Sequence, residues 1–220
     1  MAQIFRPSAD TWLRLVVLVV ALLAVGGTLA AAGYADSAYQ TRVGWVRSQP
    51  VPFSHAHHVG GLGIDCRYCH LTVETSAQAG LPPTHVCMTC HSQEWTRAPV
   101  LAPVRASWAT GRPLQWNRVA KLPDYVYFNH AIHVARGVGC VTCHGRVDEM
   151  PLMARARPFE MRFCTNCHRN PLPQLRPASR VTDPGPVGWT VDEQRRFAQA
   201  QARRFHLDGQ RLVQCDICHR

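Results

Sequence analysis

The chain has 220 residues and a formal net charge of +10, and 46% of its residues are hydrophobic. This length allows one or two domains, but part of the hydrophobic content lies in one N-terminal run, so the polypeptide alone would have a thin core. Sixteen prolines and fifteen glycines are spread along the chain, and no continuous alternation of polar and apolar residues indicates a sheet. Composition therefore argues against a sheet-rich fold. The positive charge leaves a nucleic acid or an anionic membrane open as a partner.

An apolar run of 21 uncharged residues, 15–35, follows two arginines. The run is long enough to cross a bilayer as a helix and exceeds the usual core of a secretory signal. We therefore predict a cytoplasmic N-terminus at residues 1–12, a transmembrane anchor at 13–35 and a periplasmic domain at 36–220. The alternative is a cleavable signal peptide, because the alanines at 30–32 resemble a signal-peptidase site. Both interpretations place the domain outside the cytoplasm.

Five copies of Cys-x-x-Cys-His use all ten cysteines of the chain. The two thiols of such a motif attach to the vinyl groups of one haem, and the adjacent histidine ligates the iron from one side. Zinc ribbons and disulfide frameworks also use Cys-x-x-Cys pairs, but neither requires a histidine after every pair. We therefore predict five covalently bound haem c groups, attached through Cys66, Cys69, Cys87, Cys90, Cys140, Cys143, Cys164, Cys167, Cys215 and Cys218. The proximal iron ligands are then His70, His91, His144, His168 and His219.

Haem propionates lower the net positive charge of the loaded protein. Each ferric haem with both propionates ionised adds roughly −1, so the loaded protein would carry about +5. An anionic partner is then not needed, and we expect no nucleic-acid binding. Lys121 is the only lysine among the 24 basic residues, which suits bidentate pairing of arginine with propionate and equally suits a GC-rich genome.

The haem motifs belong to an internal repeat. The first cysteines of motifs one, three and five are 74 and 75 residues apart, and those of motifs two and four are 77 apart. Segments 53–59 and 128–134, ahead of the first and third motifs, both read Phe-x-His-x-x-His-Val. We predict a two-haem unit at about 53–127, its duplicate at 128–204 and a truncated third unit at 205–220. The expected fold is mostly α with extensive irregular loops, a haem-packed core and one N-terminal transmembrane helix.

Five proximal histidines leave five axial positions to fill, and seven histidines lie outside the motifs. Four of them, His55, His58, His130 and His133, occupy the repeated segment, where a three-residue spacing lets two rings project from one helical face. We predict these four as distal ligands. For His57 and His85, a surface or propionate-bonding role is the better interpretation.

One haem then lacks a distal ligand. Met150 follows the third motif closely, and a thioether ligand would raise the potential of that haem relative to haems with two histidines. We predict Met150 as the fifth distal ligand, with Met153, Met161 and His206 as alternatives. Methionine in an apolar setting more often serves packing, so this assignment depends on the ligand count.

Several stretches without an evident haem-binding duty carry a family resemblance. They are Pro52–His55, Gly60–His70, Leu122–His144, Pro103–Arg105 and Trp116–Val119. Together with the N-terminal anchor they resemble the pentahaem cytochrome c subunit of bacterial alternative complex III, a membrane quinol oxidoreductase. The resemblance implies an iron–sulfur or molybdopterin-like partner subunit, polytopic quinol-binding membrane subunits, and a monohaem cytochrome c or terminal oxidase as acceptor. It also implies a single-pass location in the cytoplasmic membrane, with the haem domain facing the periplasm.

Three functions compete. The leading hypothesis is an electron-transfer subunit that relays electrons from quinol oxidation and performs no chemistry on a substrate. A stand-alone membrane quinol dehydrogenase feeding a periplasmic reductase is the second, but a single span gives little room for a quinol site. The third is a multihaem enzyme, which requires one open haem position and acid–base groups above it. The supply of histidines and methionines argues against that open position.

Overall fold

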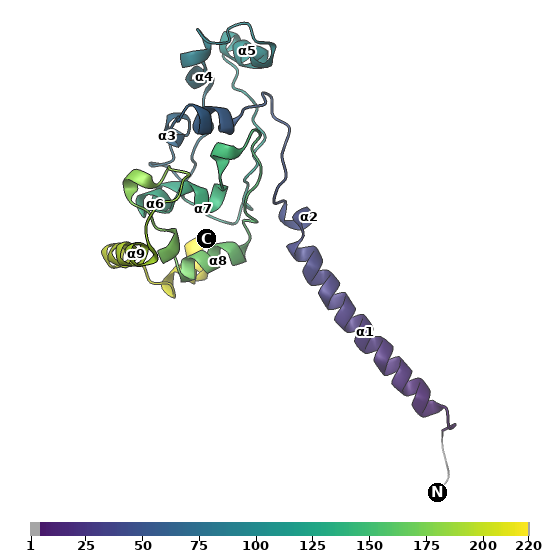
Figure 1. The fold of residues 1–220 in the computed structure, drawn as a ribbon. Helices are drawn as coiled ribbons and strands as arrows, with labels where there is room; N and C mark the ends of the chain where they lie inside the picture. The colour runs from purple at the N-terminus through teal and green to yellow at the C-terminus, as the bar shows by residue number, and fades with distance from the viewer. Residues whose placement is uncertain (1–4, 220) are drawn as a thin grey trace. The chain divides into compact units, whose positions relative to one another are not determined.

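The computed structural model describes residues 5–219 and divides them into two compact units, one ending at Arg42 and one beginning at Val43 (Figure 1). Residues 1–4 of the predicted cytoplasmic N-terminus and residue 220 of the truncated repeat lie outside the described residues. The helices are α1 (Ala9–Asp36), α2 (Ala38–Thr41), η1 (Ala56–Gly61), α3 (Cys66–Cys69), α4 (Thr84–His91), η2 (Pro99–Leu101), α5 (Ala102–Thr110), α6 (His130–Ala135), α7 (Cys140–His144), η3 (Val147–Glu149), α8 (Met161–Arg169), η4 (Leu172–Gln174), η5 (Ala178–Arg180), α9 (Val191–Phe205), η6 (Arg211–Val213) and α10 (Cys215–Cys218). The described residues contain no β-strand, so the predicted mostly helical class is confirmed.

The first unit consists of α1 and the short α2. The 28 residues of α1 span about 42 Å at 1.5 Å per residue, which exceeds the hydrocarbon thickness of a bilayer. Mean hydropathy reaches 2.6, and no side chain of α1 is buried against protein. The predicted span 13–35 lies within this helix. By length and composition, α1 can therefore cross a membrane.

An uncleaved anchor makes a direct prediction about fractionation. We expect the full chain to stay in the membrane fraction after a carbonate wash, because α1 exposes an apolar surface on all sides. A variant whose residues 1–36 are replaced by a cleavable secretory signal is the control and should be released. Release of the full chain would contradict the anchor and favour a cleaved signal peptide.

The unit beginning at Val43 has little apolar core of its own. Among the described residues, the buried hydrophobic side chains are Val51, Val73, Val86, Leu101, Val104, Leu175, Val181 and Ala198. The main cluster joins Val51, Leu101 and Val104, and it packs against Cys87 and Met88 of the second haem motif. The described residues thus bury few apolar side chains and form no continuous apolar core.

Segment 171–190 runs past the haem motifs as an ordered loop. Gln194 of α9 donates hydrogen bonds to the carbonyls of Leu172 and Leu175 at 3.1 and 2.9 Å. Leu175 and Val181 are 1% and 2% exposed, so both side chains anchor the segment in the interior. The loop is therefore held both by hydrogen bonds from α9 and by the burial of two of its own apolar side chains.

Candidate haem sites

Each Cys-x-x-Cys pair lies on one turn of a short helix, in α3, α4, α7, α8 or α10. Residues three apart face the same side of a helix, so the two thiols of a motif project together. All ten cysteines are free thiols and none forms a disulfide. His70 and His219 cap the ends of α3 and α10, and the other three motif histidines lie in the last turn of their helices. Each motif therefore presents two thiols and an imidazole from one compact turn.

The ring nitrogen Nδ1 of most predicted ligands donates a hydrogen bond to a backbone carbonyl. Among motif histidines the acceptors are the carbonyls of Gly80 for His70 (2.7 Å), Glu94 for His91 (3.2 Å), Leu212 for His168 (2.8 Å) and Tyr125 for His219 (3.1 Å). Among predicted distal ligands they are the carbonyls of Ser54 for His58 (2.9 Å), Ala77 for His130 (2.8 Å) and Asn129 for His133 (2.7 Å). A proton held on Nδ1 leaves the lone pair of Nε2 free for a metal and fixes the ring orientation.

The remaining histidines lack this feature. Within residues 5–219, neither ring nitrogen of His57, His85 or His206 has a hydrogen-bond partner. The side chain of His57 instead lies beside Trp95, with ring centres 6.2 Å apart. Among the described residues, His144 and His55 also lack such a bond, so it is made by seven of the nine predicted histidine ligands and by none of these three other histidines.

Three predicted distal histidines face a motif histidine across a gap of constant width. Ring centres are 6.2 Å apart for His58 and His91, 6.4 Å for His130 and His144, and 6.1 Å for His133 and His168. A metal–nitrogen bond of about 2 Å plus roughly 1 Å from nitrogen to ring centre, counted on both sides, gives roughly 6 Å. Each pair therefore has the spacing of two imidazoles that ligate one iron from opposite sides.

His55 completes the set of distal candidates. Burial, followed by repulsion from the His70 and His58 rings, lowers its pKa to about 4. Its Nδ1 is buried without a hydrogen-bond partner, an arrangement that is costly unless the ring is held in another way. The proximity of His55 to His70 matches the place of His130 opposite His144 in the second repeat. His55 is therefore the distal candidate for the first motif.

Burial also keeps the imidazoles neutral. The pKa of His144 falls to about 4, chiefly because the ring is buried and then because His130 and His70 lie nearby. Burial lowers the pKa of His133 and His58 as well. Neutral imidazole is the form that binds a metal, so the three measured histidine pairs, together with His55 near His70, fit axial ligation of haem iron.

The two Phe-x-His-x-x-His-Val segments have the same local geometry. Phe53 contacts the rings of His55 and His58 at 4.9 and 4.3 Å between centres, and Phe128 contacts those of His130 and His133 at 4.7 and 4.5 Å. The first ring of each segment is edge-on to the phenylalanine, at 85° and 89°. In each segment, one phenylalanine thus packs against two histidines that lie near two different Cys-x-x-Cys-His motifs.

His219 of the fifth motif has a tyrosine beside it. The Tyr125 ring stacks on His219 with 5.8 Å between centres, while its carbonyl accepts the Nδ1 hydrogen bond. Among the described residues, no second histidine ring faces His219 as one faces His91, His144 and His168. The fifth distal ligand is therefore the one that the histidine pairs do not supply.

Met150 lies next to the third motif. Its terminal methyl is 3.7 Å from the position that a Cβ on Gly145 would take, and its carbonyl accepts a hydrogen bond from the Ala56 amide at 2.9 Å. The third motif already has the His130–His144 pair, so a role for Met150 there would compete with His130. Met150 stays a prediction as fifth ligand, with Met153, Met161 and His206 as its alternatives.

A methionine ligand gives ferric haem a charge-transfer band near the red edge of the spectrum. With Met150 as the ligand, we expect Met150→Leu to abolish this band, because leucine keeps the packing volume and removes the sulfur. Met153→Leu and Met161→Leu are matched controls that should retain it. A band that survives Met150→Leu excludes this residue as the ligand.

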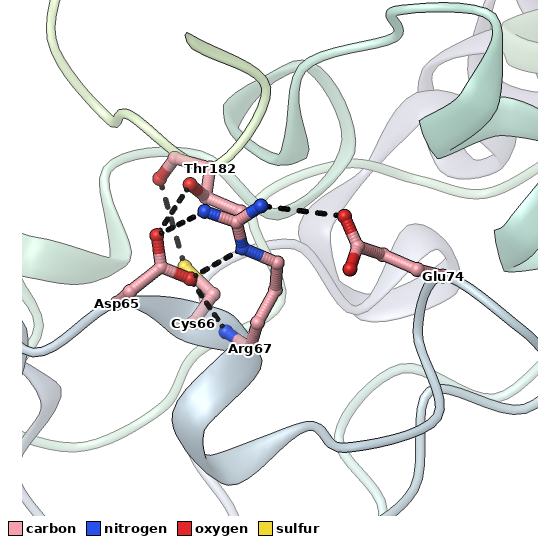
Figure 2. A network of polar contacts seen from close by, with 5 residues as sticks. All are labelled: Asp65, Cys66, Arg67, Glu74 and Thr182. Atoms are coloured by element: carbon pink, nitrogen blue, oxygen red, sulfur yellow. Dashed lines mark hydrogen bonds and ion pairs between the residues drawn. The ribbon is translucent and has the colours of Figure 1, made fainter. Parts of the chain in front are cut away.

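A polar network, shown in Figure 2, fixes the start of the first motif. Asp65 caps α3 by accepting the Arg67 amide at 2.8 Å, and its carboxylate also accepts from the Arg67 guanidinium at 2.9 Å and from the Thr182 hydroxyl at 2.8 Å. Glu74 receives a second guanidinium contact at 3.3 Å. Asp65 was not among the site residues predicted from the sequence, although an aspartate directly before a helical motif is a recognisable N-cap signal.

The network predicts a pH-dependent contribution to stability. Hydrogen bonds from Arg67 lower the pKa of Asp65 to about 2, from the usual 3.8, against the opposing effect of burial. The contribution of a carboxylate with a depressed pKa is present above about pH 4 and is lost as the pH falls toward 2. We expect Asp65→Ala to cost about 1 kcal/mol of unfolding free energy at neutral pH and little near pH 2. Thermal unfolding at both pH values measures this. Asp192→Ala, which breaks an exposed ion pair, is the control and should change stability by less than about 0.5 kcal/mol.

No family model matches the chain. The chain is similar to the menaquinone reductase, multihaem cytochrome c subunit, of Nitratidesulfovibrio vulgaris strain Hildenborough. The two are 37% identical over 99 residues, which is 44% of this chain and 46% of that subunit. The match therefore spans less than half the length of its relative.

This similarity supports a multihaem cytochrome c subunit of a quinone reductase and thus covalently bound haem c and electron transfer. It does not support alternative complex III, the specific assembly that the sequence resemblance implied. The shared part of the two interpretations is a haem subunit that serves a membrane quinone oxidoreductase.

Proposed function

We propose that this chain is a membrane-anchored, five-haem electron-transfer subunit of a quinone oxidoreductase, with its haem domain in the periplasm. The observation that carries the proposal is the set of three histidine pairs with ring centres 6.1 to 6.4 Å apart. A haem held in this way supplies one-electron transfer between its ferrous and ferric states. Four of the five motifs have a histidine available for the second axial position.

The chain contributes tethering, orientation and exclusion of other ligands. Paired cysteines hold each haem covalently on one helical turn, and the carbonyls bonded to Nδ1 fix the imidazole planes. Burial keeps His55 and His144 neutral at physiological pH. Filled axial positions prevent small molecules from binding, so this arrangement favours a carrier over the multihaem enzyme with an open site.

α1 supplies the proposed attachment to the cytoplasmic membrane. A single span leaves little room for a quinone pocket within this chain, so we assign quinone chemistry to polytopic partner subunits. The lack of room for a quinone pocket in this chain argues against the stand-alone quinol dehydrogenase.

The proposal also includes the identity of the partner subunits. The linker stretches resemble alternative complex III and imply an iron–sulfur or molybdopterin-like subunit, polytopic quinol-binding subunits, and a monohaem cytochrome c or oxidase. The relative is instead a subunit of a menaquinone reductase, in which electrons flow toward the quinone rather than away from it. Both assemblies contain a multihaem cytochrome c subunit that serves a quinone oxidoreductase.

Co-purification tests the proposal. We expect the tagged chain, extracted from its own membrane in a mild detergent, to bring with it a polytopic membrane subunit and an iron–sulfur protein, and the complex to exchange electrons with a quinol or quinone. Association with a terminal oxidase or monohaem cytochrome would identify alternative complex III. A chain that purifies alone and reacts with quinol unaided would favour the stand-alone dehydrogenase.

A further inference from the structure

The first and second motifs touch directly. The Tyr68 hydroxyl, inside the first Cys-x-x-Cys, lies 2.8 Å from the Thr89 hydroxyl, inside the second. Segment 53–59 also contacts both motifs, because His58 faces His91 of the second motif while His55 lies near His70 of the first. Motif two is thus joined to motif one.

The first and third motifs meet on segment 171–190. The Cys66 thiol lies 3.6 Å from the Thr182 carbonyl, and the Cys140 amide donates to the neighbouring Val181 carbonyl at 3.0 Å. Thr182 is also bound by Asp65, so the network of Figure 2 fastens this junction.

The third and fourth motifs share one helix of distal ligands. His130 and His133 lie three residues apart on α6, and they face His144 and His168 respectively. Consecutive motifs on either side of one helical turn must lie close together.

The fourth and fifth motifs are joined through a ligand hydrogen bond. Nδ1 of His168 donates to the carbonyl of Leu212, three residues before Cys215 of the fifth motif. Figure 1 shows α4, α3, α7 and α8 following one another through the unit that begins at Val43.

From these junctions we propose that the five attachment motifs lie in one row in the order second, first, third, fourth, fifth. The proposal rests on the proposed electron-transfer function and adds the route. The first motif in the sequence is then internal, and the second and fifth are the ends at which electrons enter and leave. The exposed cysteines agree, because Cys90 of the second motif and Cys215 of the fifth are exposed while the other eight are partly buried.

The alternative is a row in sequence order, and the two rows differ at one step. In the proposed row, an electron at motif two reaches motif three only through motif one. In sequence order it passes from motif two to motif three directly. Each transfer oxidises one ferrous iron and reduces its ferric neighbour, with no proton or bond change.

In the test, a photoreductant attached near one motif delivers an electron to it. A substitution at another motif raises the reduction potential of the haem there, so that this haem acts as a trap for the electron. Once the haems are attached, an engineered cysteine is the sole free thiol, so a thiol-reactive ruthenium polypyridine photoreductant can be placed at Trp95→Cys, a 64% exposed position next to the Glu94 carbonyl that binds His91. His55→Met supplies the trap, because a methionine ligand raises the potential of the first motif's haem.

In this labelled variant, we expect transient absorption to show the electron held at the methionine-ligated site, with reduction of the other sites slowed at least about tenfold relative to labelled protein with His55 intact. A label at Gln210→Cys, at the fifth-motif end, is the control and should reduce its nearby sites at an unchanged rate. Unslowed reduction beyond the trap from the Trp95→Cys label would overturn the proposed order.

A reciprocal variant keeps the test decisive if His55→Met loses its haem. Here the label is at Leu71→Cys, a 54% exposed position beside His70, and the trap is His58→Met at the second motif. The proposed row predicts transient reduction of sites three to five before the trap fills. Reduction of the trap alone would support sequence order. Failure of the electron to leave its first site in protein without a trap would refute the electron-transfer function itself, whatever the order.

Discussion

A chain secreted without attached haem is expected to show no cooperative unfolding transition. Eight described hydrophobic side chains are buried in the whole structure, and the largest apolar cluster has three of them, Val51, Leu101 and Val104. Five apolar porphyrins would add the contacts that the polypeptide lacks, so the cofactors stabilise the folded state directly. Removing them leaves too little buried surface to offset chain entropy.

Expression without the haem-attachment machinery provides the haem-free chain, and far-ultraviolet circular dichroism during heating provides the measurement. Matched double variants refine the expectation. Cys140→Ala with Cys143→Ala, in the middle of the proposed row, should lower the melting temperature by roughly 10 °C or more. Cys215→Ala with Cys218→Ala, at one end, should lower it less. A haem-free chain that melts cooperatively would show that the polypeptide has a sufficient core after all.

Replacing His133 with alanine is expected to convert one low-spin haem in five to a high-spin haem with an open position. His133 faces His168 at 6.1 Å between ring centres and is held by the Asn129 carbonyl at 2.7 Å. Alanine can supply neither the ligand nor a replacement donor. The dithionite-reduced variant should bind about one carbon monoxide per chain, whereas the unaltered protein should bind little at its histidine-paired sites.

His57→Ala is the matched control for this change. His57 belongs to the corresponding repeat segment but its ring has no hydrogen-bond partner, and we expect no change in carbon monoxide uptake. Equal uptake by the two variants would contradict the assignment of His133 as a ligand. Uptake by His57→Ala alone would make His57 an iron ligand and would exclude His133.

The repeated histidine pattern could be read from the sequence, but the ligand partners could not. Spacing alone predicted His58 and His133 as ligands, and the structure places their rings opposite His91 and His168, 33 and 35 residues further along the chain. Only the fold decides such non-local pairs. The carbonyls that orient the rings are equally invisible, because every residue has one and its side chain carries no signal.

The order of the motifs was also beyond sequence reasoning, for a specific reason. The junction between motifs one and three is made by Val181 and Thr182, in segment 171–190, which showed no recognisable pattern. Asp65 could have been found as an N-cap, but its bond to Thr182 crosses 117 residues. The composition did predict the thin core and the helical class correctly.

The intact mass and carbon monoxide difference spectrum of the full chain, purified in mild detergent, test the histidine-paired five-haem subunit most simply. We expect five haem additions per chain, with carbon monoxide bound by at most the fifth site, whose distal ligand is not a paired histidine. Fewer than five haems, or carbon monoxide uptake at several sites without any substitution, would contradict an electron-transfer subunit built on histidine-paired haems.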